Sequence, residues 1–359
     1  MSCSTQSLPH KRSLWSFTLK QILFKLLFSL PDRVLIWLSG QPQMKGSGGR
    51  VMDPANQLLL VALLKQRILE IDESKTVPEL REWWKSQLAR FDKPSRTDVT
   101  HRDLEVDSSG AAIRVREYTP DGIGDNAPAL VYLHGGGFTA FDIETYQAFC
   151  AFVAHTLNIN VYSVGYRRAP EHPFPIPLED CCAAFDWVSS NADGLGLDPD
   201  RIAIGGDSAG GNMSAALCLK RRDAGQRLPK AQLLIYPSTD LAGSFPSTEE
   251  FAEGQVITRE HLRWFHSNYV PNPDQMNNPY ASPLFAQDHS GLPPAVIITA
   301  GFDPLRDEAQ ALAKALTEAG VHTQHKEYAS LGHGFILADA TKAVREANHE
   351  ICQMLGSVL

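Results

Sequence analysis

From residue 112 onward, short apolar segments alternate with longer segments of helical spacing, and this alternation constrains the fold more than any other feature. The short segments are rich in Val, Ile and Tyr, which predicts strands at Ala112–Tyr118, Ala129–Leu133, Val161–Tyr166, Arg201–Ile204, Gln232–Tyr236, Ala295–Thr299 and Thr323–Tyr328. The last strand is more polar, as an edge strand would be. The intervening segments predict helices at Thr145–Thr156, Leu178–Ser190, Ala209–Arg222, Leu305–Ala319 and Ala340–Met354. Such alternation builds βαβ units, so we predict an α/β fold with a mainly parallel central sheet flanked by helices.

Two other regions do not follow this alternation. Before residue 95 the pattern predicts helices, including Asn56–Glu70 after the start signal Asp53-Pro54, and shows no clear strand. The segment 237–294 holds several prolines and one expected helix, Thr258–Tyr269. A connection of this length is usually functional, for example as a lid over a site.

The N-terminus is apolar and basic. Residues 14–30 read LWSFTLKQILFKLLFSL and follow His10-Lys11-Arg12, which resembles a signal peptide. However, Lys20 and Lys25 interrupt the apolar run, no A-x-A-like cleavage site follows, and the run is a poor membrane span. As a helix, its narrow polar stripe would be Thr18, Gln21, Lys25 and Ser29. We favour packing of this helix on its own protein, with attachment to a membrane surface as the alternative.

Composition bounds the function. With 43% hydrophobic residues, the chain of 359 residues can bury a sizeable core, and α/β folds often reach this length as one unit. A net charge of −8 gives no electrostatic reason to expect nucleic acid as a partner. The six cysteines form no CxxC pair and no metal-spaced cluster with histidine, which suits a reducing compartment and a cytoplasmic location.

The strongest local signal is Gly206-Asp207-Ser208-Ala209-Gly210, which fits G-x-S-x-G between a predicted strand and a predicted helix. Glycine on both sides of the serine removes side chains that would clash in so tight a turn, and the hydroxyl then projects from the carboxyl edge of the sheet. We predict Ser208 as a nucleophile. Asp207 cannot point the same way as Ser208, so we expect it to be a structural hydrogen-bonding group.

A second glycine motif, His134-Gly135-Gly136-Gly137, follows the strand Ala129–Leu133. Attack on an ester creates an oxyanion that needs fixed N–H donors, and glycine allows the backbone to approach it. We predict the amides of Gly135, Gly136 and Ala209 as these donors.

A serine nucleophile needs a base held by a carboxylate. Asp303 and His333 each directly follow a predicted strand, and they come after Ser208 in the order Ser, Asp, His. Because carboxyl ends of parallel strands share one edge, we predict these three side chains to meet. Asp307 would lie one turn into a helix, and His322 and His325 lie before or within a strand, so they are weaker candidates.

Together these motifs resemble the hormone-sensitive lipase family of α/β hydrolases, which includes many microbial carboxylesterases. The resemblance covers the chain from about residue 100 and rests on His134–Gly137, Gly206–Gly211 (GDSAGG), Asp303-Pro304-Leu305, His333-Gly334-Phe335 and Tyr166-Arg167-Arg168-Ala169-Pro170-Glu171 with the following His-Pro-Phe-Pro.

The resemblance implies an α/β-hydrolase catalytic domain over residues 96–359. It also implies a helical cap made of residues 1–95 and an insertion at about 240–285. Members hydrolyse short- to medium-chain acyl esters without cofactor or metal, and they often dimerise through a sheet edge, which raises the expectation of a homodimer.

Three function classes follow from these features. The leading one is an esterase with Ser208 as nucleophile, His333 as base and Asp303 as its orienting acid. The same machinery serves an amide or lactone hydrolase. A non-catalytic binding protein on this scaffold is the third, although such proteins lack a member of the triad that is complete here. The aromatics Phe138, Phe251, Trp264 and Phe335 are candidates to line the pocket, with core packing as the alternative.

Overall fold

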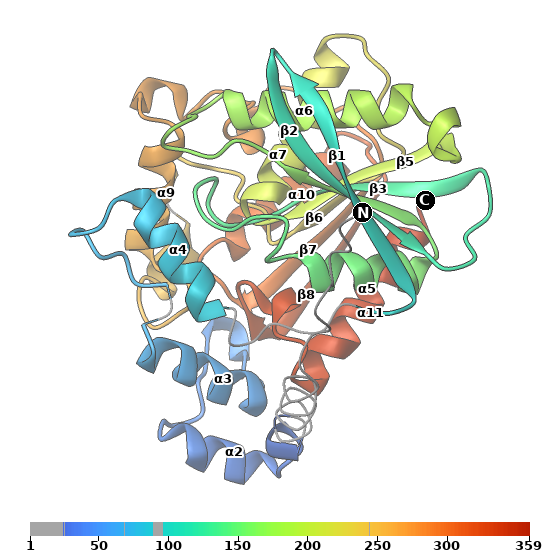
Figure 1. Cartoon of the computed structure of the whole chain (residues 1–359). Helices are drawn as coiled ribbons and strands as arrows, with labels where there is room; N and C mark the ends of the chain where they lie inside the picture. The colour runs from blue at the N-terminus through green and yellow to red at the C-terminus, as the bar shows by residue number, and fades with distance from the viewer. Residues whose placement is uncertain (1–23, 25, 68, 89–95, 244) are drawn as a thin grey trace, which may run out of the picture.

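The computed structural model describes residues 24, 26–67, 69–88, 96–243 and 245–359 (Figure 1). The expected helix over residues 14–30 therefore lies mostly outside the described residues, and so do Thr18, Gln21 and Lys25 of its polar stripe.

In the described chain, eight strands form one sheet in the order β1-β2-β4-β3-β5-β6-β7-β8. Their bounds are β1 Val99–Ser108, β2 Ala111–Pro120, β3 Ala127–Leu133, β4 Asn160–Gly165, β5 Leu197–Asp207, β6 Gln232–Ile235, β7 Ala295–Phe302 and β8 Thr323–Gly332. β2 pairs antiparallel with both β1 and β4, and every other pairing is parallel. The predicted α/β fold with a mainly parallel sheet is confirmed, and the polar strand β8 lies at the edge.

Strand β1 was not predicted from the sequence, because VTHRDLEVDS is mostly polar and exposed. Its pairing with β2 begins at Ser108 and Ala111 and so leaves a two-residue turn, Ser109-Gly110, with positive φ at both residues. Such a turn joins two antiparallel strands directly. An edge strand needs only one buried face, so β1 is defined by this hairpin rather than by hydrophobicity.

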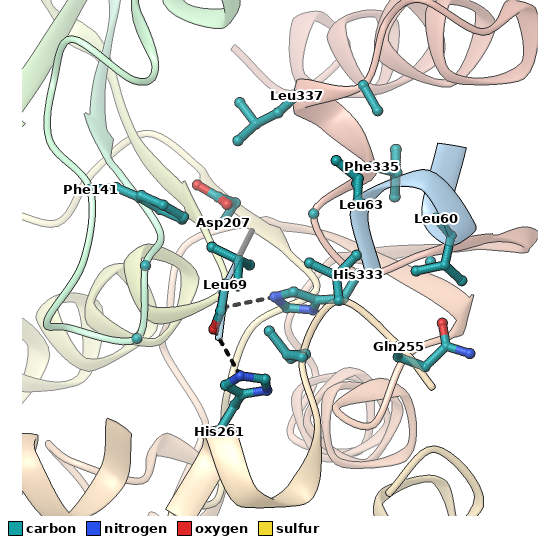
Figure 2. Close-up of a pocket in the computed structure, with 18 of the residues that line it drawn as sticks. Leu60, Leu63, Leu69, Phe141, Asp207, Gln255, His261, His333, Phe335 and Leu337 are labelled. Carbon is teal, nitrogen blue, oxygen red and sulfur yellow. Dashed lines mark hydrogen bonds between the residues drawn. The ribbon is translucent and has the colours of Figure 1, made fainter. Parts of the chain in front are cut away.

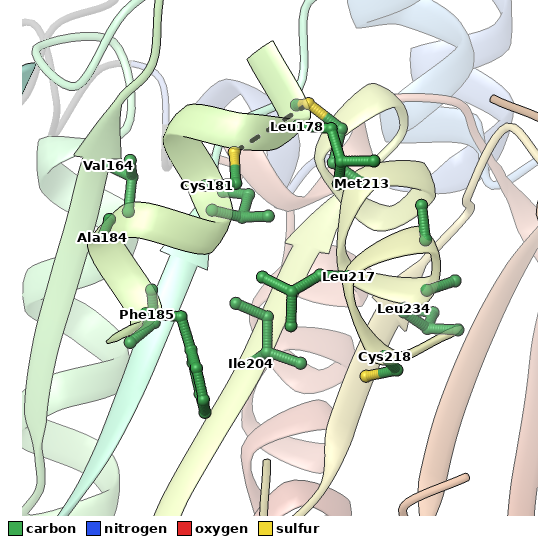
Figure 3. Packing of buried hydrophobic residues seen from close by; sticks show 14 of the residues in the cluster. Val164, Leu178, Cys181, Ala184, Phe185, Ile204, Met213, Leu217, Cys218 and Leu234 are labelled. Atoms are coloured by element: carbon green, nitrogen blue, oxygen red, sulfur yellow. Dashed lines mark hydrogen bonds between the residues drawn. The ribbon is translucent and has the colours of Figure 1, made fainter. Parts of the chain in front are cut away.

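Helices cover both faces of the sheet. α5 (Gln147–Leu157) and α11 (Lys342–Gly356) pack on one face, and α6 (Ile176–Ser190), α7 (Ala209–Asp223) and α10 (Arg306–Glu318) pack on the other. Successive side chains of β3 alternate between the two cores, since Val131 and Leu133 join one while Leu130 and Tyr132 join the other. Figure 3 shows the core on the face covered by α6, α7 and α10. In this core, Ile204 of β5 lies among side chains of α6 and α7 such as Cys181 and Leu217.

The other helices lie outside these two layers. They are α2 (Asp32–Ser39), α3 (Pro54–Lys65), α4 (Val77–Leu88), α8 (Pro246–Glu250) and α9 (Arg259–Tyr269). α3 ends five residues before the predicted Glu70, and α8 was not predicted. The N-terminal helices pack against the 237–294 segment, because Nε2 of His261 lies 3.0 Å from the carbonyl oxygen of Leu69 and the rings of Trp84 and Trp264 meet edge-on at 6.0 Å.

No helix in the described part of the chain is both long and apolar enough to cross a membrane.

Candidate active site

Ser208 occupies a sharp turn between β5 and α7. Its backbone has φ 54° and ψ −119°, and its amide donates to the carbonyl oxygen of Ile235 at 2.8 Å. A Cβ atom at Gly206 would lie 2.3 Å from the carbonyl oxygen of Leu133, and one at Gly210 would lie 1.9 Å from the same oxygen. The two glycines therefore let the turn pass directly against the end of β3, which agrees with the steric role predicted for them.

Ser208, His333 and Asp303 come together at the carboxyl edge of the sheet. Nε2 of His333 lies 3.1 Å from Oγ of Ser208, and its Nδ1 lies 2.8 Å from Oδ2 of Asp303. The second carboxylate oxygen of Asp303 accepts the amide of Leu305 at 2.8 Å, which fixes the fully buried carboxyl group. The ring of Tyr236 packs against His333 at 4.6 Å. This arrangement allows His333 to take a proton from Ser208 while Asp303 holds the imidazole in orientation.

The weaker candidates lie elsewhere. Asp307 is in the first turn of α10, where it accepts the amide of Ser247 at 2.9 Å and the Nε–H of Arg306 at 2.7 Å. His325 lies within β8 with its ring against the hydroxyl of Thr299, and His322 precedes that strand.

Asp207 is a buried hydrogen-bonding group, as predicted. Its Oδ1 accepts the hydroxyl of Tyr132 at 2.8 Å and the amide of Gly135 at 2.9 Å, and its Oδ2 accepts the hydroxyl of Tyr146 at 2.9 Å. Burial raises the pKa of Asp207 to about 6, and the three donors oppose this rise because they stabilise the charged form.

The contact with Asp207 corrects the expectation for Gly135. An amide that already donates to a carboxylate is not available to an oxyanion, and Gly135 does not line the cavity above Ser208. Gly136, Gly137 and Ala209 do line it. The sequence could not separate these glycines, because the direction of each amide depends on the backbone turn after β3.

His134 supports the same loop. Its ring is buried and stacks on Tyr166 with centroids 4.3 Å apart, and the hydroxyl of Tyr166 donates to the carbonyl oxygen of His134 at 2.8 Å. Burial lowers the pKa of His134 to about 4, so the ring is neutral near pH 7.

A cavity of about 520 Å³ opens above Ser208 and is lined mainly by apolar side chains. Figure 2 shows His333 near its centre, with Leu60 and Leu63 of α3 on one side and Phe141 on the other. Two of the four proposed aromatics, Phe138 and Phe335, line this cavity. The other two belong to neighbouring clusters, since Phe251 packs on Phe302 and Trp264 on Trp84.

Several lining residues had no signal in the sequence. Leu60, Leu63 and Trp84 come from the N-terminal helices, and Phe265 and His266 come from α9. Burial lowers the pKa of His266 to about 4, and its Nε2 lies 3.4 Å from the hydroxyl of Ser238. In the described residues, no three His, Cys, Asp or Glu side chains gather where they could hold a metal ion.

Known proteins share this architecture. A sequence family described by the alpha/beta hydrolase fold matches residues 130–337. The chain is 40% identical to the carboxylic ester hydrolase LipN of Mycobacterium tuberculosis over 298 residues, which cover 80% of this chain and 78% of that protein. The chain belongs to the hormone-sensitive lipase group of the α/β hydrolases.

Two further similar proteins extend the likeness over most of the chain. An arylesterase of Saccharolobus solfataricus is 31% identical, with 86% of this chain and 98% of that protein covered. The solved structure of the ester-hydrolase EH1AB1 from the metagenome of Lake Arreo, complexed with a derivative of bipyridine phosphonate, superimposes with a TM-score of 0.81 at 37% identity. It covers 85% of this chain and 98% of that one.

Proposed function

We propose that the chain is a serine carboxylesterase that hydrolyses short- to medium-chain acyl or aryl esters. The observation that carries this proposal is the hydrogen-bonded series Ser208–His333–Asp303 at the base of an apolar cavity. The names of its relatives support it, because they include a carboxylic ester hydrolase and an arylesterase.

The first half of the reaction forms an acyl-enzyme. Oγ of Ser208 attacks the acyl carbonyl while Nε2 of His333 takes its proton, and the carbonyl electron pair moves onto the oxygen. Asp303 stabilises the resulting imidazolium through Nδ1. The C–O bond to the alcohol then breaks, and His333 returns the proton to the leaving oxygen.

The oxyanion of this reaction requires N–H donors from the loop after β3 and from the start of α7. We assign the amides of Gly136, Gly137 and Ala209, since all three residues line the cavity beside Ser208. Water then attacks the acyl-enzyme with His333 as base, and the acid is released from Ser208.

The preferred acyl chain follows from the cavity. Its volume of about 520 Å³ and its Leu and Phe lining suit an aliphatic or aryl group, with no dedicated polar subsite required. We assign the catalytic unit to residues 96–359 and the cap to residues 1–95 with the insertion at about 240–285, because helices of both cap segments supply lining residues. We expect no cofactor or metal.

Hydrolysis of p-nitrophenyl esters from acetate to palmitate, with wild type beside Ser208→Ala, tests the proposal. We expect activity that falls at long chains and is absent in the variant, which should remain folded by circular dichroism. Labelling of Ser208 by a serine-reactive phosphonate gives an independent readout. If wild type hydrolyses no ester and Ser208 is not labelled, the esterase proposal is wrong and the chain is a binding protein on this scaffold. If wild type hydrolyses aryl acetamides or lactones in preference to esters, the proposed substrate class is wrong.

A further inference from the structure

Large exposed hydrophobic side chains are concentrated near the N-terminus. Ten such side chains occur in the described residues, and six of them lie between residues 24 and 38: Phe24, Leu26, Leu30, Val34, Trp37 and Leu38. The side chain of Trp37 is 77% exposed. Single exposed hydrophobics are ordinary on a soluble protein, but a run of this density marks a surface that contacts something apolar. These six residues are called the N-terminal surface below.

Helix α2 explains how the surface is presented. Leu35 and Ser39 are buried, and the helix packs on α3. Val34, Trp37 and Leu38 are exposed, and their spacing places them on one face of α2, while the exposed Leu30 lies just before the helix. Figure 1 shows α2 at the outer end of the molecule, beyond α3. One face of α2 is therefore packed on α3, and the opposite face is uncovered.

The charge of this region identifies its partner. In the sequence, residues 1–38 contain one acidic residue, Asp32, and five basic ones, at Lys11, Arg12, Lys20, Lys25 and Arg33, although the whole chain has a net charge of −8. Of these six residues, only Asp32 and Arg33 lie in the described part of the chain. A second copy that met this surface through its own N-terminal region would bring like charges together. An anionic lipid surface attracts a basic segment that adjoins apolar residues in the sequence, and tryptophan is favoured at such an interface.

The N-terminal surface is continuous with the candidate active site. The rings of Phe24 and Phe28 stack with centroids 6.1 Å apart, and both line the cavity that holds Ser208. Phe24 is also 37% exposed. Apolar contact thus extends from the outside of the N-terminal region to the interior of the cavity.

We propose that the N-terminal surface docks the protein on an anionic phospholipid bilayer, with Trp37 and Leu38 among the headgroups. An apolar ester dissolved in the lipid then reaches Ser208 past Phe24 and Phe28. Entry of the ester rests on the proposed function, whereas docking does not.

Flotation of the full chain with phospholipid vesicles tests the docking. Vesicles of phosphatidylcholine alone are compared with vesicles that also contain phosphatidylglycerol, at low and high salt. We expect binding to the anionic vesicles that weakens in salt. The Trp37→Ser/Leu38→Ser variant should bind the anionic vesicles with an affinity lowered about tenfold or more, since it loses the apolar contact. Trp83→Ser, at a 40% exposed tryptophan on α4, is the matched control and should float like wild type.

Soluble p-nitrophenyl acetate separates the two proposals. A variant that hydrolyses it like wild type but fails to float is folded and supports docking. If the double variant misfolds, Arg33→Glu replaces it and should also reduce flotation. If wild type floats with the vesicles but hydrolyses no ester, the docking proposal stands and the esterase proposal is wrong.

Docking is wrong if wild type binds no vesicle, or if the variants float as well as wild type. It is also wrong if sedimentation reveals a dimer that Trp37→Ser/Leu38→Ser disrupts, since a second copy would then cover the surface.

Discussion

The amide of Gly135 donates a hydrogen bond of 2.9 Å to the carboxylate of Asp207, and this contact joins the loop after β3 to the turn after β5. Because the acceptor is charged, the bond is stronger than one between neutral groups. It holds the loop that carries Gly136 and Gly137 in register with Ser208. Asp207 is therefore a positioning residue for the proposed oxyanion donors, although it does not touch the reacting atoms.

Asp207→Asn should lower kcat about tenfold or more with little change in KM, because a neutral amide holds the loop less firmly and cannot accept from all three donors. Tyr132→Phe is the matched control, since it removes one donor to Asp207 and leaves the Gly135 contact intact. Steady-state kinetics on one ester, with thermal unfolding of each variant, measures both effects. If kcat falls equally in the two variants, Asp207 stabilises the fold but does not position the proposed oxyanion donors.

Gly137→Ala should lower kcat roughly a hundredfold, because an added Cβ would lie 2.2 Å from Cγ of Phe265 and would displace the loop. Phe265→Ala opens that space, so the double variant should recover part of the activity. Recovery stays partial because φ at this position is +59°, which disfavours alanine. Gly135→Ala provides the contrast: its Cβ would meet Asp207 at 2.5 Å, and Phe265→Ala should not rescue it.

Leu63→Trp should shift the acyl preference toward short chains. Leu63 lines the cavity from α3, and a larger side chain there fills space that a longer acyl group would occupy. We expect the ratio of kcat/KM for octanoate to that for acetate to fall roughly tenfold. Leu64→Trp changes the adjacent, 38% exposed residue outside the lining and should leave the ratio unchanged. A shift of the same size in both variants would contradict this assignment of the acyl site.

His266 should contribute pH-dependent stability. Its pKa is lowered to about 4 in the fold, against about 6.5 in the unfolded chain, so only the unfolded chain binds a proton between these values. The contribution of His266 is therefore complete above about pH 6.5 and is lost as pH falls toward 4, amounting to about 3 kcal/mol.

Urea unfolding of wild type and His266→Gln at pH 7 and 4.5 isolates this contribution, because other titrating groups cancel in the difference. The destabilisation caused by the substitution should narrow by about 2–3 kcal/mol at the lower pH. A constant difference would show that His266 does not titrate as proposed.

The sequence alone determined the fold class and the meeting of Ser208, Asp303 and His333. Each of these residues directly follows a strand that the alternating pattern predicts, and parallel strands bring their carboxyl ends to one edge. Strand β1 was not predicted, because its segment is mostly polar and lies before the strand–helix alternation that allowed the polar edge strand β8 to be predicted.

Only the tertiary structure decided which of the glycines after His134 line the cavity and which other side chains line it. The three glycines after His134 are identical in sequence, and the turn of the backbone directs Gly135 to Asp207 while Gly136 and Gly137 remain at the cavity. The lining joins Leu63 of α3 with Phe265 of α9, which no local pattern relates. Such contacts depend on how helices distant in the chain pack together, and hydrophobic periodicity specifies only that each helix has a face to bury.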